Sequence, residues 1–232
     1  MSWKVPPSHV VIFGRPGSGK SSLAEQLGAD HGFLLIRTGE LLRNAIRKGD
    51  SLGVRAEQLI KGGNLVPDSL IAELLEQTLK TPGTDRLLFD GFPRTLGQVP
   101  ILANFEQTLN FRIDCYLEIA VSHEAAIKRM TGRRVCPTCG STYHLVNQPP
   151  RVPERCDRDG TALEQRPDDT AEVIEVRQQI YNKHGLPILE YYRNNAPDRF
   201  RTVNGEQSYE AVYDETCRAL GLKDGASESA SS

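Results

Sequence analysis

The 232-residue sequence has almost no net charge, no long apolar run and an odd number of cysteines. Its 28 Lys and Arg residues against 30 Asp and Glu residues give a formal charge of −2, so no global basic balance points to nucleic acid or an anionic membrane. No window approaches the roughly 18 apolar residues of a membrane span, and the first residues lack the apolar stretch of a secretory signal. We therefore expect a cytoplasmic protein that acts on small molecules.

The five cysteines do not form an even set, and three of them lie between positions 136 and 156. This distribution fits a reduced compartment and a metal site better than a disulfide framework. The length allows one sizeable domain with insertions, and the sequence has no internal repeat. We therefore expect one hydrophobic core.

Residues 14–21 match the pattern G-x-x-x-x-G-K-[ST] with suitable flanks. The apolar residues 9–13 before them predict a buried strand, and residues 22–27 after them predict a helix. Glycines in such a loop let backbone N–H groups turn inward around an oligophosphate, and Lys20 adds a mobile cation. Either Ser21 or Ser22 can place its hydroxyl on a magnesium ion.

Short apolar runs alternate with helical patterns along the rest of the chain. Thr38 is a plausible N-cap of one helix, and Ser122 of another. Alternation of this kind predicts an α/β fold with a doubly wound, five-stranded parallel sheet. The expected strands are residues 9–13, 33–36, 86–90, 113–119 and 199–203, and later helices are expected from residue 68, over 96–105, 122–130, 170–192 and 209–220.

Asp90 ends the third apolar run, and Arg94 follows closely. Because the carboxyl ends of parallel strands line the ligand crevice, both side chains should lie beside the phosphate loop. Asp90 is a candidate for holding magnesium through water, and the alternative is an ordinary loop or N-cap carboxylate.

Two C-x-x-ligand pairs lie sixteen residues apart in a proline-rich and polar insertion after residue 131. This spacing predicts a closed, structural zinc site that pins a region with too little apolar surface to fold alone. His144 and Asp157 are rival fourth ligands that break the spacing, and cysteines without metal remain a further alternative. The predicted ligands are Cys136, Cys139, Cys156 and Asp159.

Arginines stand at or near the ends of several predicted elements. Each alone is more often a solvated charge, but together they suit phosphoryl transfer, because planar guanidinium groups clamp phosphates bidentately. Positioning and electrostatics would then supply the catalysis without a dedicated nucleophile. These arginines are at positions 43, 94, 129, 133, 166 and 177.

Over residues 9–221 the sequence resembles an adenylate kinase of the long type, whose lid carries a zinc knuckle. Several motifs in one order carry the resemblance, and together they are more specific than the phosphate loop alone. They are the G-x-P-G-x-G-K loop, Thr38-Gly39 with Arg43, Leu65-Val66, 90–95 (DGFPRT) with Gln98, 132–135 (GRRV), Tyr143-His144, Arg166 with Asp168-Asp169, and Arg177.

The resemblance implies the reversible transfer of the terminal phosphoryl group of ATP to AMP, giving two ADP, in purine nucleotide salvage and energy homeostasis. It also implies ATP-Mg as co-substrate, structural zinc and a monomer. The implied segments are an N-terminal arm and core at 1–36, core at 67–131 and 170–221, an AMP-side flap at 37–66 and a lid at 132–169. A composition rich in Gly, Ala, Ser and Glu predicts a disordered tail at 222–232.

The same resemblance implies roles for individual residues. Lys20, Arg94, Arg133, Arg166 and Arg177 would be catalytic. Gly17, Ser18, Gly19, Lys20, Ser21, Ser22, Arg129, Arg133, Thr142, Tyr143 and Gln207 would bind ATP. Thr38, Arg43, Asn64, Leu65, Val66, Gly91, Phe92, Pro93, Arg94 and Gln98 would bind AMP, with Arg166 and Arg177 bridging the reacting phosphates and Asp168 and Asp169 orienting the clamp or the ribose.

The chain departs from the family pattern at a few positions. Ser21-Ser22 replaces Gly-Thr, Glu40 replaces an aspartate, Arg37 replaces a small residue and Asn204 replaces an aspartate. A kinase for UMP or CMP therefore stays open as an alternative, as does a non-catalytic, zinc-bearing nucleotide-binding module. Intact arginines count against the second alternative.

Overall fold

Five strands form one sheet in the computed structural model, which describes residues 6–49, 51–61, 66–80, 86–146, 148–166 and 169–222. They are β1 (His9–Phe13), β2 (Leu34–Arg37), β3 (Leu87–Asp90), β4 (Cys115–Ala120) and β7 (Phe200–Asn204). Every neighbouring pair is parallel, and the order β2-β3-β1-β4-β7 places the first strand at the centre. The predicted five-stranded parallel sheet is confirmed.

The two faces of the sheet are covered by different helices, because side chains alternate along each strand. Val10 and Ile12 of β1 pack against α1 (Lys20–His31) and α9 (Tyr209–Leu220). Val11 and Phe13 belong to a larger cluster with α4 (Asp68–Leu79), α5 (Val99–Thr108) and α8 (Leu186–Asn195). The central strand is therefore buried on both sides, which holds the loop that follows it rigidly.

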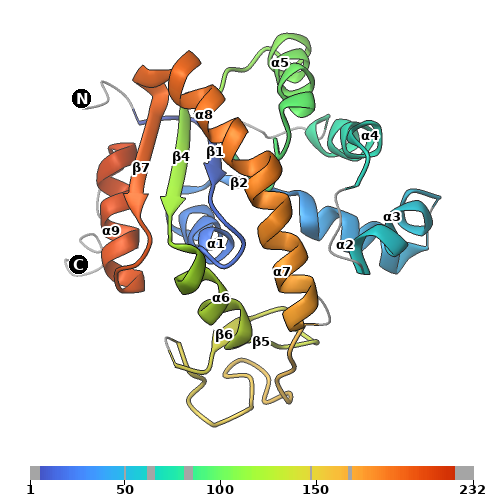
Figure 1. The fold of residues 1–232 in the computed structure, drawn as a ribbon, viewed down its shortest axis with the longest axis vertical. Helices are drawn as coiled ribbons and strands as arrows, with labels where there is room; N and C mark the ends of the chain where they lie inside the picture. The colour runs from blue at the N-terminus through green and yellow to red at the C-terminus, as the bar shows by residue number, and fades with distance from the viewer. Residues whose placement is uncertain are drawn as a thin grey trace, which may run out of the picture.

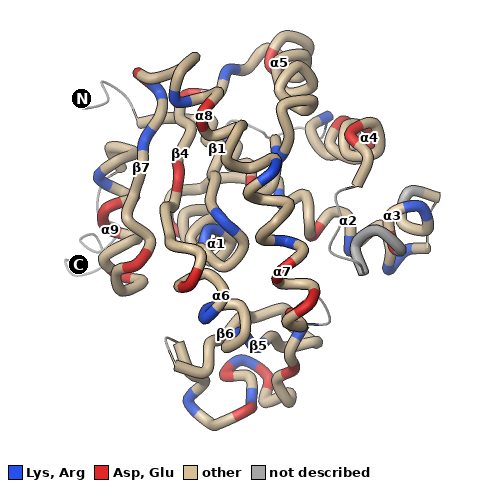
Figure 2. Tube along the Cα trace, viewed as in Figure 1, with Lys and Arg blue, Asp and Glu red and all other residues tan. Residues whose placement is uncertain are grey.

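Two inserted segments project from this core in different directions (Figure 1). Helices α2 (Thr38–Lys48) and α3 (Ser51–Lys61) lie at the right of the view. The hairpin of β5 (Arg133–Val135) and β6 (Thr142–His144) lies at the bottom, beyond α6 (His123–Thr131). Lys and Arg positions are mixed with Asp and Glu positions over the chain (Figure 2). Among the residues described, no helix is both long and apolar enough to cross a membrane.

A long helical segment crosses the molecule between these two insertions (Figure 1). It comprises α7 (Ala171–Ile180), a π-helical turn at Tyr181–Gly185 and α8. The sequence predicts continuous helix over 170–192, whereas the structure widens the helix at the π turn. Short 3-10 helices at Leu96–Gln98 and Pro197–Arg199 complete the elements.

The predicted cap of α2 is wrong, whereas that of α6 is confirmed. Thr38 is the first helical residue of α2, and its hydroxyl makes no capping bond. Its Oγ1 is buried without a hydrogen-bond partner among the described residues, because the side chain faces a cavity instead of the helix end. Ser122 accepts the N–H of Ala125 at 3.2 Å, as expected of an N-cap.

Candidate functional site

The loop between β1 and α1 has the geometry of an anion cradle. Gly17 and Gly19 have φ angles of +91° and +86°, which side-chain-bearing residues rarely adopt. A Cβ on Gly17 would lie 2.4 Å from the carbonyl oxygen of Ala126, so close packing also requires glycine there. Helix α1 starts without a side-chain cap and without an acid in its first turn. Its N-terminal N–H groups therefore stay available to an anion.

The cradle is tied to the long helical segment by two polar side chains. Gln178 is fully buried and donates through Nε2 to the carbonyl oxygen of Pro16 at 3.0 Å. Arg15 donates through Nη1 to Gln178 Oε1 at 3.0 Å and to Asn182 Oδ1 at 2.9 Å, and its guanidinium lies 4.7 Å from the centre of the Tyr181 ring. Sequence reasoning missed this anchor, and an arginine inside the glycine loop was its sole local signal.

Asp90 lies directly beside the start of α1, as its position at a strand end predicts. Ser21 donates its hydroxyl to Asp90 Oδ2 at 2.5 Å, and the carboxylate is almost buried. The Ser21 hydroxyl is therefore the one placed next to the candidate magnesium-holding carboxylate.

Lys20 is surrounded by protein and by other cations. Burial in the walls of the cleft lowers its pKa from 10.5 to about 8. The negative charge of Asp90 acts in the opposite direction, and the positive charges of Arg94, Arg177 and Arg133 lower the pKa further. Three arginines from distant parts of the chain therefore act electrostatically on one lysine, so positive charge gathers at this site.

A cavity of about 200 Å³ opens beside this lysine. It lies between the ends of β1 and β3, helices α2 and α4, and the π turn. The orphaned Thr38 hydroxyl is part of its wall. Its other charged and polar lining residues are Lys20, Arg43, Arg94, Gln98 and Arg177, and Ile12, Phe13, Leu42, Val66, Ile71 and Pro93 are among its apolar ones.

Arg94 is held in the loop after β3. Its Nε donates to the carbonyl oxygen of Gly91 at 2.9 Å, and its backbone N–H donates to Gln98 Oε1 at 2.7 Å. Gly91 has a φ of +88°, and a Cβ there would lie 2.7 Å from Arg94 Nη2. A glycine at this position thus lets the guanidinium fold back beside the backbone.

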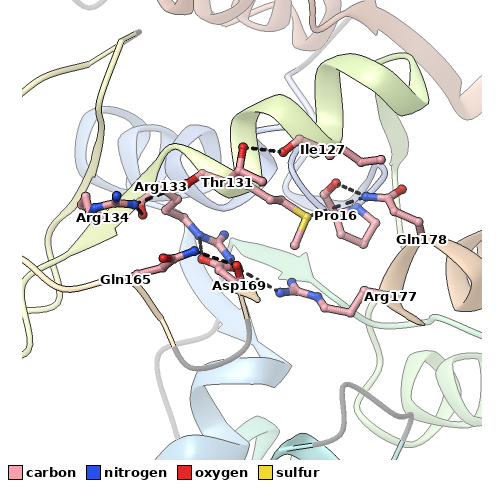
Figure 3. A network of polar contacts seen from close by, with 10 residues as sticks. Pro16, Ile127, Thr131, Arg133, Arg134, Gln165, Asp169, Arg177 and Gln178 are labelled. Atoms are coloured by element: carbon pink, nitrogen blue, oxygen red, sulfur yellow. Dashed lines mark hydrogen bonds and ion pairs between the residues drawn. The ribbon is translucent and has the colours of Figure 1, made fainter. Parts of the chain in front are cut away.

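Asp169 connects the base of the hairpin segment to α7 (Figure 3). Its fully buried carboxylate accepts two hydrogen bonds from Arg133, through Nη2 and, at 2.7 Å, through Nε. Arg177 Nη1 lies 3.4 Å from the same carboxylate, and Gln165 Nε2 donates to the Asp169 carbonyl oxygen at 2.7 Å. One buried acid therefore fixes two of the predicted catalytic arginines relative to each other.

The four predicted metal ligands converge in the hairpin segment. Their donor atoms all lie within 4.8 Å of one another, with Cys139 Sγ 3.5 Å from Cys156 Sγ and Cys136 Sγ 3.4 Å from Asp159 Oδ2. Hydrogen bonds from Thr161 lower the pKa of the Asp159 carboxyl below its ordinary value, so it is ionised as a ligand must be. Three thiols and one carboxylate at these separations fit tetrahedral zinc.

The two C-x-x-ligand pairs, Cys136 with Cys139 and Cys156 with Asp159, share the same turn geometry. Gly140 and Gly160 follow the ligand pairs at φ angles of +77° and +71°, and their N–H groups donate to the carbonyl oxygens of Cys136 and Cys156 at 3.0 and 2.9 Å. The rival fourth ligands are engaged elsewhere. His144 Nδ1 accepts from the N–H of Val146, and Asp157 Oδ1 accepts from the N–H of Arg151 at 2.8 Å.

Comparison with known proteins identifies the family. A model described as Adenylate kinase matches residues 12–197. The chain is 39% identical over 213 residues to the adenylate kinase of Moorella thermoacetica, covering 91% of this chain and 97% of that protein. For the adenylate kinase of Bacillus velezensis the identity is 36% over 214 residues, covering 92% and 98%, and for that of Archaeoglobus fulgidus it is 35% over 208 residues, covering 89% and 95%.

This chain belongs to the adenylate kinase family. The chain is therefore related to nucleoside monophosphate kinases, which are phosphotransferases, and the family resemblance read from its motifs is confirmed. Two of the departures from the adenylate kinase pattern contact each other, because Arg37 Nη2 lies 2.7 Å from Glu40 Oε2 in a partly exposed ion pair.

Most residues expected to form the monophosphate side of an adenylate kinase line the cavity. Phe92 is an exception, because its ring is buried in the core beneath the loop with 1% of its surface exposed. Asn64, Leu65 and Asp168 lie outside the described residues. The expected residues on the wall are Thr38, Arg43, Val66, Gly91, Pro93, Arg94, Gln98 and Arg177.

The expected ATP-side residues of an adenylate kinase are more scattered. Arg129 reaches the phosphate loop, where its Nη1 donates to the Ser18 carbonyl oxygen at 3.4 Å. Thr142 pairs with Val135 in the hairpin. Other members of the expected set lie elsewhere: Arg133 at the base of the hairpin, Tyr143 with its hydroxyl 3.4 Å from Cys156 Sγ, and Gln207 bonded to Asn204 and Glu215. The carbonyl oxygen of Arg166, which was expected to bridge the reacting phosphates, accepts the N–H of Asp169 at 3.0 Å.

Proposed function

We propose that this chain catalyses the reversible, magnesium-dependent transfer of the terminal phosphoryl group of ATP to AMP, giving two ADP. One observation carries the proposal. Lys20 at the end of the phosphate loop and Arg43, Arg94 and Arg177 from three other segments line the same cavity. A triphosphate on the loop and a monophosphate among the arginines would then meet end to end, as phosphoryl transfer requires.

In this reaction an oxygen of the AMP phosphate forms a bond to the γ-phosphorus of ATP, while the bond from that phosphorus to the bridging oxygen of the leaving ADP breaks. No side chain needs to become covalently attached. Lys20, Arg94, Arg133, Arg166 and Arg177 would spread and neutralise the charge on the transferring group. Gly17 to Ser22, Arg129, Thr142, Tyr143 and Gln207 would hold ATP, and the cavity residues would hold AMP.

Ser21 and Asp90 would face the magnesium ion that arrives with ATP. The buried carboxylate and its hydroxyl partner are oxygen donors of the type magnesium prefers. Cys136, Cys139, Cys156 and Asp159 would hold zinc in a closed, structural site. Segment 37–66 would act as the AMP-side flap and segment 132–169 as the lid. Cytoplasmic location, a monomeric state and a role in nucleotide salvage and energy homeostasis complete the proposal.

A turnover assay tests the proposal. Purified protein with ATP-Mg is given AMP, CMP, UMP or GMP in turn, and ADP formation is followed. The proposal expects the highest kcat/KM with AMP. A preference for CMP or UMP would reassign the chain to another nucleoside monophosphate, and binding of ATP without turnover of any monophosphate would support a non-catalytic module.

A further inference from the structure

Asp68 and Gln98 meet behind the wall of the cavity, although they are 30 residues apart in the chain. Gln98 Nε2 donates to Asp68 Oδ1 at 2.7 Å. Gln98 is part of the cavity wall, with 3% of its surface exposed, whereas Asp68 is not a lining residue. Asp68 is the first residue of α4 and contacts the glutamine from the protein side.

The carboxylate can approach because glycine precedes Gln98. A Cβ on Gly97 would lie 2.7 Å from Asp68 Oδ2, closer than such atoms approach in folded proteins. The hydroxyl of Thr95 lies 3.4 Å from the same oxygen. The segment Thr95 to Gln98 is therefore folded around the Asp68 side chain.

These contacts fix which way the Gln98 amide points. On its other side, Gln98 Oε1 accepts the backbone N–H of Arg94 at 2.7 Å. A flip of the amide by 180° would set its NH₂ group against that N–H and its oxygen against the Asp68 carboxylate. Both contacts would become repulsive, so a single orientation is allowed.

The pinned amide keeps some hydrogen-bonding capacity. Gln98 Oε1 can accept one more hydrogen bond, and Nε2 has a second hydrogen to donate. Adenine offers the complementary pair, a donor at the 6-amino group beside an acceptor at N1. A 6-oxo purine such as hypoxanthine offers an acceptor at O6 beside a donor at N1, which calls for the flipped amide.

We propose that Asp68 is a positioning residue that makes the site select 6-amino over 6-oxo purine monophosphates, by holding the Gln98 amide in one orientation. This inference rests on the proposed function, in which Gln98 faces the base of AMP. A freely rotating glutamine would serve either base, because its amide presents a donor and an acceptor at equal reach. The discrimination comes from the fixed orientation, which the carboxylate holds together with the Arg94 N–H.

Asp68 has a competing, purely structural role, because an acid in the first turn of α4 favours the helix through its dipole. The two roles separate in the readout. Loss of a helix-stabilising charge lowers the melting temperature and leaves base selectivity unchanged, whereas loss of the pin changes selectivity.

The test measures kcat/KM for AMP and for inosine monophosphate with saturating ATP-Mg, in wild type and in Asp68→Asn. An asparagine can accept from or donate to the Gln98 amide, so the preference of AMP over inosine monophosphate should fall about tenfold. Glu210→Gln is the matched control, because it removes an exposed first-turn acid from α9, on the opposite face of the sheet from the cavity. Its preference should equal that of wild type.

Gly97→Ala provides a second variant that keeps the Asp68 charge. Its methyl group displaces the carboxylate from Gln98, so the preference should fall in the same direction, and this variant decides the question if Asp68→Asn does not fold. An unchanged preference in a folded variant, with or without a lower melting temperature, overturns the proposal. A wild type that uses other monophosphates and forms no ADP from AMP would overturn the proposed function and this inference with it.

Discussion

In the cavity the polar groups come from distant segments of the chain, whereas in the hairpin segment four candidate ligands lie within 24 residues of chain. Thr38 Oγ1 is buried without a partner among the described residues, and the pKa of Lys20 is lowered to about 8. Cys136, Cys139, Cys156 and Asp159 converge within 4.8 Å. The cavity is thus organised by the sheet, and the hairpin segment by four side chains that fit a metal ion.

This difference separates the origins of rigidity in the two regions. The cavity inherits its geometry from strands buried on both faces, so a charged side chain can be removed without unfolding the protein. The hairpin has a buried cluster of only Cys136, Tyr143 and Cys156 among the described residues, with Leu163 packed against it. Such a cluster buries too little apolar surface to be stable alone. Activity and stability should therefore respond in opposite ways in the two regions.

The largest effect is expected for Lys20→Met. Turnover should fall by about 10³-fold, because the loop loses the cation that neutralises the phosphates in the transition state. The melting temperature should not fall, since the lowered pKa of Lys20 shows that its ammonium group is disfavoured in the folded protein, and the variant removes that group. A coupled ADP assay and thermal melting measure both quantities.

Lys80→Met is the matched control for this variant. Lys80 is a largely exposed residue at the end of α4, paired with Glu76 at 2.8 Å. Its loss should leave turnover near the wild-type value. Near-normal turnover in Lys20→Met itself would remove the lysine from the catalytic set.

The next largest effect is expected for Asp169→Asn, which acts at the junction of the two regions. The variant leaves Arg133 and Arg177 facing each other without their shared anion, which should cost about 3 kcal/mol of unfolding free energy. Turnover should fall about 10²-fold, because both guanidinium groups lose their fixed positions. Chemical denaturation and steady-state kinetics check the two effects.

Asp198→Asn removes an acid from an exposed 3-10 turn and should change neither quantity. If Asp169→Asn keeps the wild-type turnover while losing stability, the link between the two arginines is structural and has no bearing on the reaction.

Local patterns predicted the frame of this molecule well. The strand at residues 9–13 and the helix at 209–220 have the predicted bounds, because their periodicity is set by burial along a single element. The position of Asp90 beside the phosphate loop also followed from local signals, since strand ends of a parallel sheet meet at one edge, but the choice of Ser21 over Ser22 did not. Residues whose positions depend on their own strand or loop could therefore be predicted from the sequence.

Contacts that depend on packing between distant segments could not be predicted from the sequence. Arg15 and Gln178 are 163 residues apart, and no local pattern ties one to the other. The π turn at Tyr181–Gly185 lies between two segments that both have helical spacing, so periodicity predicted continuous helix. Tyr143 was predicted to bind ATP, but the position of its hydroxyl beside Cys156 depends on how the hairpin folds, which no local pattern shows.

Metal removal should lower stability more than turnover, which is the reverse of the effect expected for Lys20→Met. Chelation, or Cys139→Ser, should lower the melting temperature by about 5 °C or more while changing turnover at low temperature much less. The reason is that the ligands hold the hairpin and do not line the cavity. Metal analysis should find one zinc per chain.

Added zinc provides the control, because it should restore the melting temperature of the chelated wild type and not that of Cys139→Ser. Carefully prepared protein without stoichiometric zinc, melting at the same temperature before and after chelation, would contradict the assignment of the site.

The smallest effect concerns the pH dependence of stability. The pKa of Lys20 is about 8 in the folded protein and near 10.5 in the unfolded chain, so between these values the unfolded chain binds more protons. The free energy of unfolding therefore rises with pH between these two values. The cost of keeping the ammonium group charged in the folded protein is fully present below pH 8, and it is lost toward pH 10.5. From pH 7.5 to 10, the difference in melting temperature between Lys20→Met and wild type should therefore shrink by a few degrees, which corresponds to ~1 kcal/mol. Saturating ATP should abolish this trend, since a bound polyphosphate favours the charged lysine. If the difference in melting temperature does not change with pH in the absence of ATP, the pKa of Lys20 is not lowered in the folded protein.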